Sequence, residues 1–149
     1  MTTLQNFQKI IYLVDDDPDD RLLFLDAIQD INVAVEVQEL EDGQELIDVL
    51  DQSPKIFPEF IFLDINMPRK TGLDCLSEIK KYNGALKNTK VIMLSTSNNQ
   101  FNIKKAFDLG ANFYAVKPNT FIGLKNLVKE VLEKDWKQEE LSQQKMLIF

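Results

Sequence analysis

Four short apolar runs and one mixed segment recur along this chain, and each is followed by a longer segment with apolar residues at helical spacing. The apolar runs lie at residues 10–14, 60–63, 91–94 and 113–116, and the mixed segment at 33–40, which includes Glu36, Gln38 and Glu39, is interpreted as a further strand. Continuous apolar runs of this length are typical of strands buried on both faces of a sheet. The alternation predicts βαβ units, and therefore an α/β fold: a doubly wound, five-stranded parallel sheet with helices on both faces.

Helix signals fill the segments between the predicted strands. Asp17 can cap a helix, and Pro18 suits its first position. Gly110 is placed to end a later helix. The five predicted helices carry their apolar stripes at 22–28, 46–50, 73–79, 103–107 and 124–131. The tail after Trp136 is left open, because it can continue the last helix, dock on the body or fray.

The length of 149 residues suits one domain, and no linker or repeat divides it, so we expect a single domain over residues 1–149. No apolar run approaches the ~20 residues of a membrane span. The first residues lack the pattern of a signal peptide. Cys75 is the only cysteine, and it cannot form an internal disulfide. We therefore expect a cytoplasmic protein without a membrane partner.

Charge and composition exclude several classes of function. The formal net charge of −7 disfavours nonspecific binding to nucleic acid or an anionic membrane. The chain has no histidine, which excludes serine–histidine and cysteine–histidine nucleophiles, histidine-ligated zinc and a phosphohistidine of its own. Any chemistry must therefore use carboxylates, hydroxyls, lysine and backbone groups.

Polar residues stand where the predicted strands end. Asp15 and Asp16 follow the first strand, Asp64 the third, Ser95 the fourth and Lys117 the fifth. In an open parallel sheet the carboxyl ends of the strands lie along one edge, where ligands bind. We therefore expect these five side chains to converge.

Together, these side chains suit cation binding and phosphoryl transfer. Three close carboxylates repel one another unless a hard cation joins them, and oxygen ligands without histidine suit Mg²⁺. A carboxylate flanked by a metal, a lysine and a hydroxyl suits phosphoryl transfer, because the negative phosphoryl oxygens meet cations and donors. Each residue alone has a simpler interpretation. In particular, Asp17, Asp19 and Asp20 are interpreted as residues that stabilise a helix start.

Four segments together resemble the receiver domains of bacterial response regulators, the CheY-like superfamily, over about residues 8–135. They are LVDDD at 13–17, FLDINMP at 62–68 with Gly72, VIMLS at 91–95 and GANFYAVKP at 110–118. The resemblance implies a flavodoxin-like sheet with strand order 2-1-3-4-5. Residues from about 136 to 149 would form a C-terminal extension of a stand-alone receiver.

The resemblance also implies a role for each matching residue. Asp64 would be the phosphoacceptor, and Asp16 and Asp64 would bind Mg²⁺ directly. The backbone carbonyl of Asn66 would be a further ligand, and Asp15 would act through water. Ser95 and Lys117 would bind the phosphoryl group, and Tyr114 would be the aromatic residue that changes position when the protein is phosphorylated. The peptide bond between Lys117 and Pro118 is expected to be cis, as only a proline readily allows.

The chain departs from the common pattern in three places. Lys70 and Thr71 stand before Gly72, where Met-Asp is more common, and the basic Pro68-Arg69-Lys70 stretch resembles stand-alone receivers paired with phytochrome-type kinases. Thr96 is bulkier than the alanine or glycine often found there, and could narrow access to the site. Asn66 and Ser97 occupy positions that tune phosphoryl lifetime in the family.

The resemblance implies a signalling phosphoacceptor that catalyses only its own phosphotransfer and dephosphorylation. Its donor would be a sensor histidine kinase or phosphotransfer protein, and its output a downstream protein target or a homodimer partner. No direct role on nucleic acid is expected.

Three alternatives remain open at this point. A phosphate-ester hydrolase would want a second carboxylate where Asn66 stands. A flavin-binding carrier would want a loop rich in serine, threonine and glycine in place of Asp15 to Asp17. A degenerate receiver would bind partners without phosphorylation, although the intact acceptor set argues against it.

Overall fold

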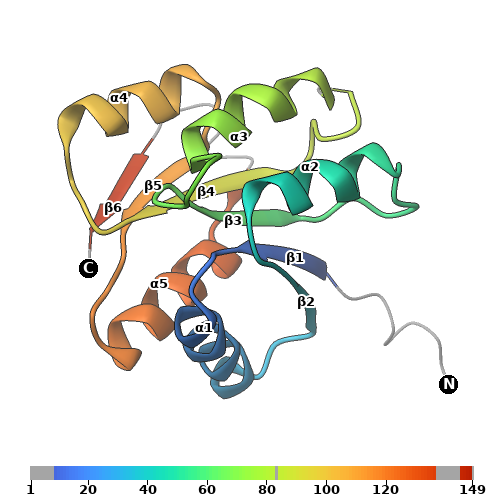
Figure 1. Cartoon of the computed structure of the whole chain (residues 1–149). Coiled ribbons are helices and arrows are strands. Elements are labelled where there is room, and N and C mark those ends of the chain that lie inside the picture. Colours follow the sequence, from blue (N-terminus) through green and yellow to red (C-terminus); the bar gives the residue numbers. More distant parts are fainter. Residues whose placement is uncertain (1–8, 83, 137–144, 149) are drawn as a thin grey trace, which may run out of the picture.

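The computed structural model describes residues 9–82, 84–136 and 145–148, which form one parallel sheet with helices on both faces (Figure 1). The strands are β1 (Lys9–Val14), β2 (Val35–Leu40), β3 (Phe60–Asp64), β4 (Lys90–Ser95), β5 (Phe113–Val116) and β6 (Lys145–Ile148). The helices are α1 (Pro18–Ile31), α2 (Gly43–Asp51), α3 (Gly72–Ile79), α4 (Gln100–Asp108) and α5 (Phe121–Glu133), with a 3₁₀ turn η2 (Lys80–Tyr82). The expected start of the domain at residue 8 and most of the extension 136–149 lie outside the described residues.

The strands pair in the order β2-β1-β3-β4-β5-β6, and every pair is parallel. The order 2-1-3-4-5 implied by the resemblance is therefore confirmed. One strand is added to it. β6 pairs with β5 in the register Phe113 opposite Lys145 and Val116 opposite Ile148. Of the three alternatives left for the tail, docking on the body is the one observed for residues 145–148.

Burial along the strands follows their place in the sheet. All five residues of β3 and all six of β4 are buried, as expected for central strands covered on both faces. β2 lies at an edge and alternates partly buried and exposed residues. β3 and β4 each run one residue further than predicted, so Asp64 and Ser95 are the last residues of their strands.

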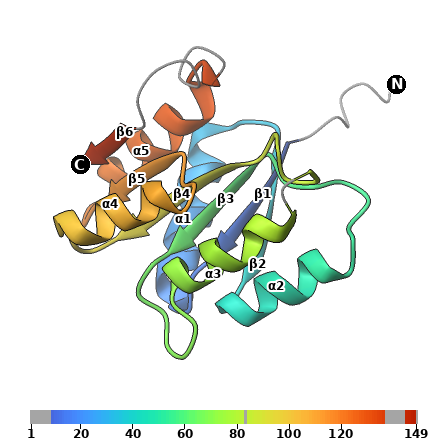
Figure 2. The same ribbon diagram turned by 90° about the horizontal axis from the view of Figure 1, so that it is seen from above.

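Two apolar cores lie on opposite faces of the sheet. Alternate residues of β1 show the division, because Tyr12 and Val14 belong to one core and Ile11 and Leu13 to the other. Helices α2, α3 and α4 cover the first face, and α1 and α5 cover the second (Figure 1). Figure 2 shows α2, α3 and α4 side by side above the strands. The core thus holds the carboxyl ends of β1, β3, β4 and β5 at a fixed edge.

The predicted helix signals are confirmed. The side chain of Asp17 accepts a hydrogen bond from the backbone N–H of Asp19, and Pro18 is the first residue of α1. After α4, Gly110 has φ of 106°, a left-handed conformation that suits glycine after a helix end. Among the described residues, none of the helices combines the length and hydropathy needed to cross a bilayer.

Candidate functional site

The carboxylates of Asp15, Asp16 and Asp64 meet at the carboxyl edge of the sheet. One oxygen from each lies within 4.8 Å of the other two. Asp15 and Asp64 are buried, whereas Asp16 is exposed. Three oxygen donors this close fit a hard divalent cation, because the cation would remove their mutual repulsion and leave room for further oxygen ligands. The structure therefore brings together the acidic residues predicted from the strand ends.

Lys117 provides the positive charge of this site. Its Nζ lies 3.0 Å from Asp15 Oδ2, 3.3 Å from Asp64 Oδ2 and 2.9 Å from Asp20 Oδ2. These pairs join residues 53 to 102 positions apart in the chain. The ammonium thus crosses the edge of the sheet from β5 to the ends of β1 and β3 and to the first turn of α1.

Burial and neighbouring charges act in opposite directions on the pKa values of Asp64 and Lys117. Burial raises the pKa of Asp64 to about 6, with Lys117 lowering it and Asp15 raising it. Burial alone would lower the pKa of Lys117, but the hydrogen bond to Asp20 and the charges of Asp64 and Asp15 raise it above its ordinary value. Lys117 therefore stays a cation at neutral pH. Asp64, whose pKa remains below 7, is mainly a carboxylate there.

Backbone groups fix the inner carboxylates in place. Asp15 Oδ1 accepts a hydrogen bond from the N–H of Asp17 at 2.9 Å, and Asp64 Oδ1 accepts one from the N–H of Asn66 at 3.1 Å. Arg21 Nη1 donates to the backbone oxygen of Asp15 at 2.7 Å. Each buried carboxylate thus has one oxygen held by backbone and the other facing Lys117.

Ser95 and Tyr114 both contact Ser97, in the segment that follows β4. Ser95 is fully buried, and its Oγ accepts a hydrogen bond from the N–H of Ser97 at 3.1 Å. The Tyr114 ring is also fully buried, and its hydroxyl donates to the backbone oxygen of Ser97 at 2.8 Å. The segment after β4 is therefore tied to both side chains, so a movement of either one is transmitted to it.

A hydrogen bond between Asn66 and Thr96 joins the loops that follow β3 and β4. Asn66 Nδ2 donates to Thr96 Oγ1 at 3.3 Å, and both side chains are exposed at this contact. The N–H of Asn66 also donates to Asp64 Oδ1, so this residue links the acidic site to the loop after β4.

One expectation about the backbone is wrong. The peptide bond between Lys117 and Pro118 is trans, and none of the described residues has a cis peptide bond. The trans isomer is intrinsically favoured by about 0.5–1 kcal/mol for a bond before proline. In this structure the N–H of Lys117 donates to Ser95 O at 2.7 Å, and its side chain reaches the carboxylates of Asp15 and Asp64.

Asp20 belongs to the site, although its place in the sequence predicts only a role at the helix start. It lies four residues after Asp16, one helical turn along α1, and its carboxylate contacts Lys117. The spacing from Asp16 was the available signal. A carboxylate in a first helical turn has a sufficient local explanation, however, and the contact depends on how α1 packs beside β5.

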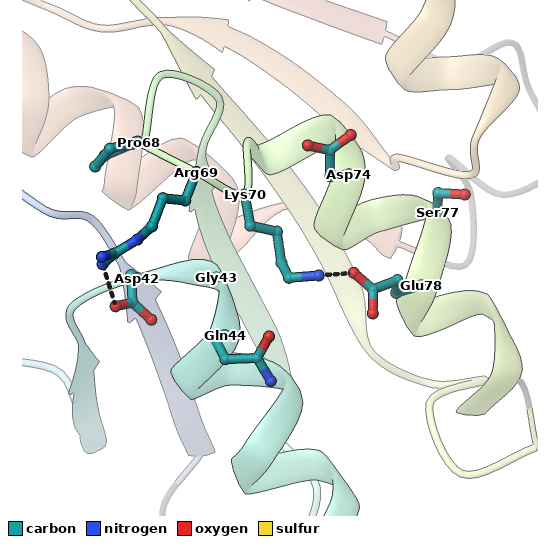
Figure 3. Close-up of a pocket in the computed structure, with 9 residues that line it drawn as sticks. All are labelled: Asp42, Gly43, Gln44, Pro68, Arg69, Lys70, Asp74, Ser77 and Glu78. Atoms are coloured by element: carbon teal, nitrogen blue, oxygen red, sulfur yellow. Dashed lines mark hydrogen bonds and ion pairs between the residues drawn. The ribbon is translucent and has the colours of Figure 1, made fainter.

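Apart from the acidic cluster, the protein has a hollow between α2, α3 and the β3–α3 loop (Figure 3). It measures about 710 Å³. Two ion pairs join its walls: Arg69 with Asp42 at 3.8 Å, and Lys70 with Glu78. The basic residues that depart from the common receiver pattern thus pair with Asp42, the N-cap of α2, and with Glu78 of α3.

The fold and the acidic site define a class of protein, and comparison with known proteins identifies the same class. Residues 11–131 match the model of the response regulator receiver domain. The chain therefore belongs to the response regulator receiver family. This membership weighs against the hydrolase and flavin-carrier alternatives.

Two curated relatives span most of the chain. Response regulator Rcp1 of Synechocystis sp. is 33% identical over 144 residues, which are 91% of this chain and 94% of Rcp1. The probable methanogenesis regulatory protein FilR2 of Methanothrix harundinacea is 29% identical and covers 83% of this chain and 81% of its own.

Solved structures extend the likeness. The phosphorylated cyanobacterial phytochrome response regulator RcpA has a TM-score of 0.75 at 35% identity, covering 85% of this chain and 92% of RcpA. The Mn²⁺-bound form of Rcp1 has a TM-score of 0.72 at 29% identity, covering 86% and 94%. Chemotaxis protein CheY4 of Vibrio cholerae, 24% identical with a TM-score of 0.70 and covering 83% and 98%, shares the fold.

Proposed function

We propose that this chain is a phosphoacceptor of a two-component phosphorelay, with Asp64 as the residue that is phosphorylated. One observation carries the proposal: the buried Asp64 carboxylate lies in contact with Lys117 and inside a cluster of three carboxylates. A nucleophilic oxygen, a fixed cation and a cation-binding acid cluster are the parts that phosphoryl transfer to an aspartate requires.

The donor is a phosphohistidine on a sensor histidine kinase or a phosphotransfer protein. An oxygen of Asp64 attacks the phosphorus, and a P–O bond forms as the P–N bond to the histidine breaks. The electron pair of that bond leaves with the imidazole nitrogen, which takes up a proton. Asp64 is suited to this attack because its pKa of about 6 leaves it mainly ionised at neutral pH.

Mg²⁺ is the cofactor that fits the acid cluster. Asp16 and Asp64 would hold it directly, with the backbone carbonyl of Asn66 as a further ligand and Asp15 acting through water. When bound, Mg²⁺ neutralises charge on the incoming phosphoryl oxygens. The oxygen donor set supports this assignment, and the Mn²⁺-bound form of the relative Rcp1 agrees with it.

Phosphorylation would then shift the population of two arrangements of the site. The phosphoryl group carries close to two negative charges, and it draws Lys117 and the hydroxyl of Ser95 toward it. Ser95 would turn its Oγ from the Ser97 N–H, and Tyr114, which holds the Ser97 carbonyl, would move with that segment. The charge change at Asp64 thereby reaches the surface around α4, β5 and α5.

The result of this switch is a changed protein contact, with a downstream target or a second copy of the chain. The likeness to RcpA, itself a phytochrome response regulator, supports a phytochrome-type sensor kinase as the donor. We place the protein in the cytoplasm. Catalysis is limited to its own phosphorylation and dephosphorylation.

The test is incubation with a small phosphodonor such as acetyl phosphate, with and without Mg²⁺, followed by intact mass measurement. Wild type should gain one phosphoryl group, about 80 Da, only with Mg²⁺, and Asp64→Asn should gain none. A wild-type protein that stays unmodified, and that also does not bind beryllofluoride, would overturn the proposal.

A further inference from the structure

The side chain of Lys117 has no N–H left for a phosphoryl group in this structure. An ammonium has three N–H donors. Those of Lys117 face Asp15, Asp20 and Asp64 at 3.0, 2.9 and 3.3 Å. To bind a phosphoryl oxygen, Lys117 must therefore give up one of these three carboxylates.

The three carboxylates differ in their surroundings. Asp15 and Asp64 belong to the cluster that fits a divalent cation, whereas Asp20 does not. A bound cation would share the negative charge of Asp15 and Asp64 and weaken their attraction for Lys117. The attraction of Asp20 would stay, so in the cation-bound protein Asp20 becomes the main partner of Lys117.

Asp20 is also the partner that can be released at the lowest cost. Its side chain is 43% exposed, against 3% for Asp15 and 5% for Asp64. Water can replace Lys117 at an exposed carboxylate, while a buried carboxylate left alone carries the full desolvation penalty. Release of Asp20 is therefore the step that frees Lys117 for a phosphoryl group.

We propose that Asp20 is a positioning residue that holds Lys117 in the resting arrangement and competes with a phosphoryl group on Asp64 for its ammonium. This inference rests on the proposed function. Asp20 touches neither the acid cluster nor the phosphorus, and it acts only through Lys117. Its strength as a hydrogen-bond partner thereby sets part of the balance between the resting and activated states.

Asp19 provides a matched control for this role. It lies in the same first turn of α1 as Asp20, and Asp19→Asn removes the same charge from the same helix end. The carboxylates in contact with the Lys117 ammonium are those of Asp15, Asp20 and Asp64, and Asp19 is not one of them. A general gain in anion affinity from a lower negative charge should appear in both variants, whereas the effect of freeing Lys117 should appear only in Asp20→Asn.

The experiment measures the affinity of the full chain for beryllofluoride at saturating Mg²⁺, by fluorine NMR, with thermal unfolding in parallel. We expect Asp20→Asn to bind beryllofluoride roughly threefold to tenfold more tightly than Asp19→Asn, the size of one ordinary net hydrogen bond, because the Asp20 carboxylate is partly exposed. In a Lys117→Met background, Asp20→Asn should have no effect beyond that of Asp19→Asn. A purely structural role would move the unfolding temperature and leave the beryllofluoride affinity unchanged.

The outcomes separate this inference from the proposed function. Three results would each overturn the proposed competition between Asp20 and the phosphoryl group. The two variants could bind beryllofluoride equally, Asp20→Asn could bind it more weakly, or the effect of Asp20→Asn could persist in the Lys117→Met background. If wild type binds no beryllofluoride at all, the phosphoacceptor function itself falls.

Discussion

The Cβ that Gly72 lacks would stand 2.4 Å from the backbone oxygen of Asp64 and 2.8 Å from the Cα of Ile65. The neighbouring atoms are backbone, so no side chain can move aside to make room. The N–H of Gly72 also donates to Ile65 O at 3.0 Å. The start of α3 is thus packed directly on the end of β3, where Asp64 lies.

Gly72→Ala should therefore both destabilise the fold and displace Asp64. We expect a loss of about 1–3 kcal/mol in the free energy of unfolding, the usual range for overpacking, measured by urea denaturation. Gly84→Ala is the control, because a Cβ at Gly84 would meet nothing within 4 Å. The prediction would be wrong if Gly72→Ala lowered the free energy of unfolding no more than Gly84→Ala does. That result would show that the backbone after β3 can move to make room for the added Cβ.

Removal of the exposed Asp16 carboxylate should weaken cation binding without destabilising the fold. Asp16 is exposed and lies in the acid cluster, so Asp16→Asn should leave the metal-free unfolding temperature nearly unchanged. Its affinity for Mg²⁺ should fall by about tenfold or more, because one of the two carboxylates proposed to bind the ion directly is lost. Calorimetric titration with Mg²⁺ measures this, and Asp19→Asn supplies the comparison. Equal Mg²⁺ affinities in the two variants would remove Asp16 from the ligand set.

Gly43 and Cys75 should be coupled across the contact of α2 with α3. A Cβ on Gly43 would lie 2.2 Å from Cys75 Sγ, and Cys75 is fully buried. Gly43→Ala alone should cost about 1–3 kcal/mol of stability through overpacking. The double variant with Cys75→Ala should recover most of that cost, because the added methyl occupies space vacated by sulfur. Additive losses in a double-mutant cycle would contradict this.

The Cys75 thiol should be unreactive in the folded protein. Burial raises its pKa to about 12, so the reactive thiolate is scarce between pH 7 and 9, where a free cysteine with a pKa near 8.5 ionises. Labelling with a disulfide reagent should therefore be slow, and its rate should keep rising about tenfold per pH unit through pH 9, because this range lies far below the pKa of the buried thiol; in denaturant labelling should be rapid. A rapid native-state reaction whose rate levels off above about pH 8.5 would show an exposed, ordinary thiol.

Local signals predicted most of the fold, because local physics decides it. Asp17 and Pro18 specify a helix start without reference to the rest of the chain, and Phe60 to Leu63 are apolar enough to require burial on both faces. From such elements the parallel sheet follows. The site at the strand ends then follows from the sheet, as the meeting of Asp15, Asp64 and Lys117 shows.

What the sequence did not predict depends on packing between distant elements. Pairing of residues 145–148 with β5 requires an open sheet edge, and a short apolar run at the end of a chain carries no sign of one. The contact of Asp20 with Lys117 requires α1 and β5 to be in place. The expected cis bond before Pro118 was carried over from the family resemblance, and the bond is trans in this structure.

The 102-residue separation between Asp15 and Lys117 bears on the order of synthesis. A chain emerging from the ribosome exposes its acidic residues early, but it has no ammonium to set among them until β5 has been made and paired with β4. Until then Asp64 and Asp15 lack their counter-charge and their final environment. The acidic site is therefore completed only after Lys117 has been made and β5 has joined the sheet, and a copy cut before Lys117 would keep the carboxylates without the cation that lies among them.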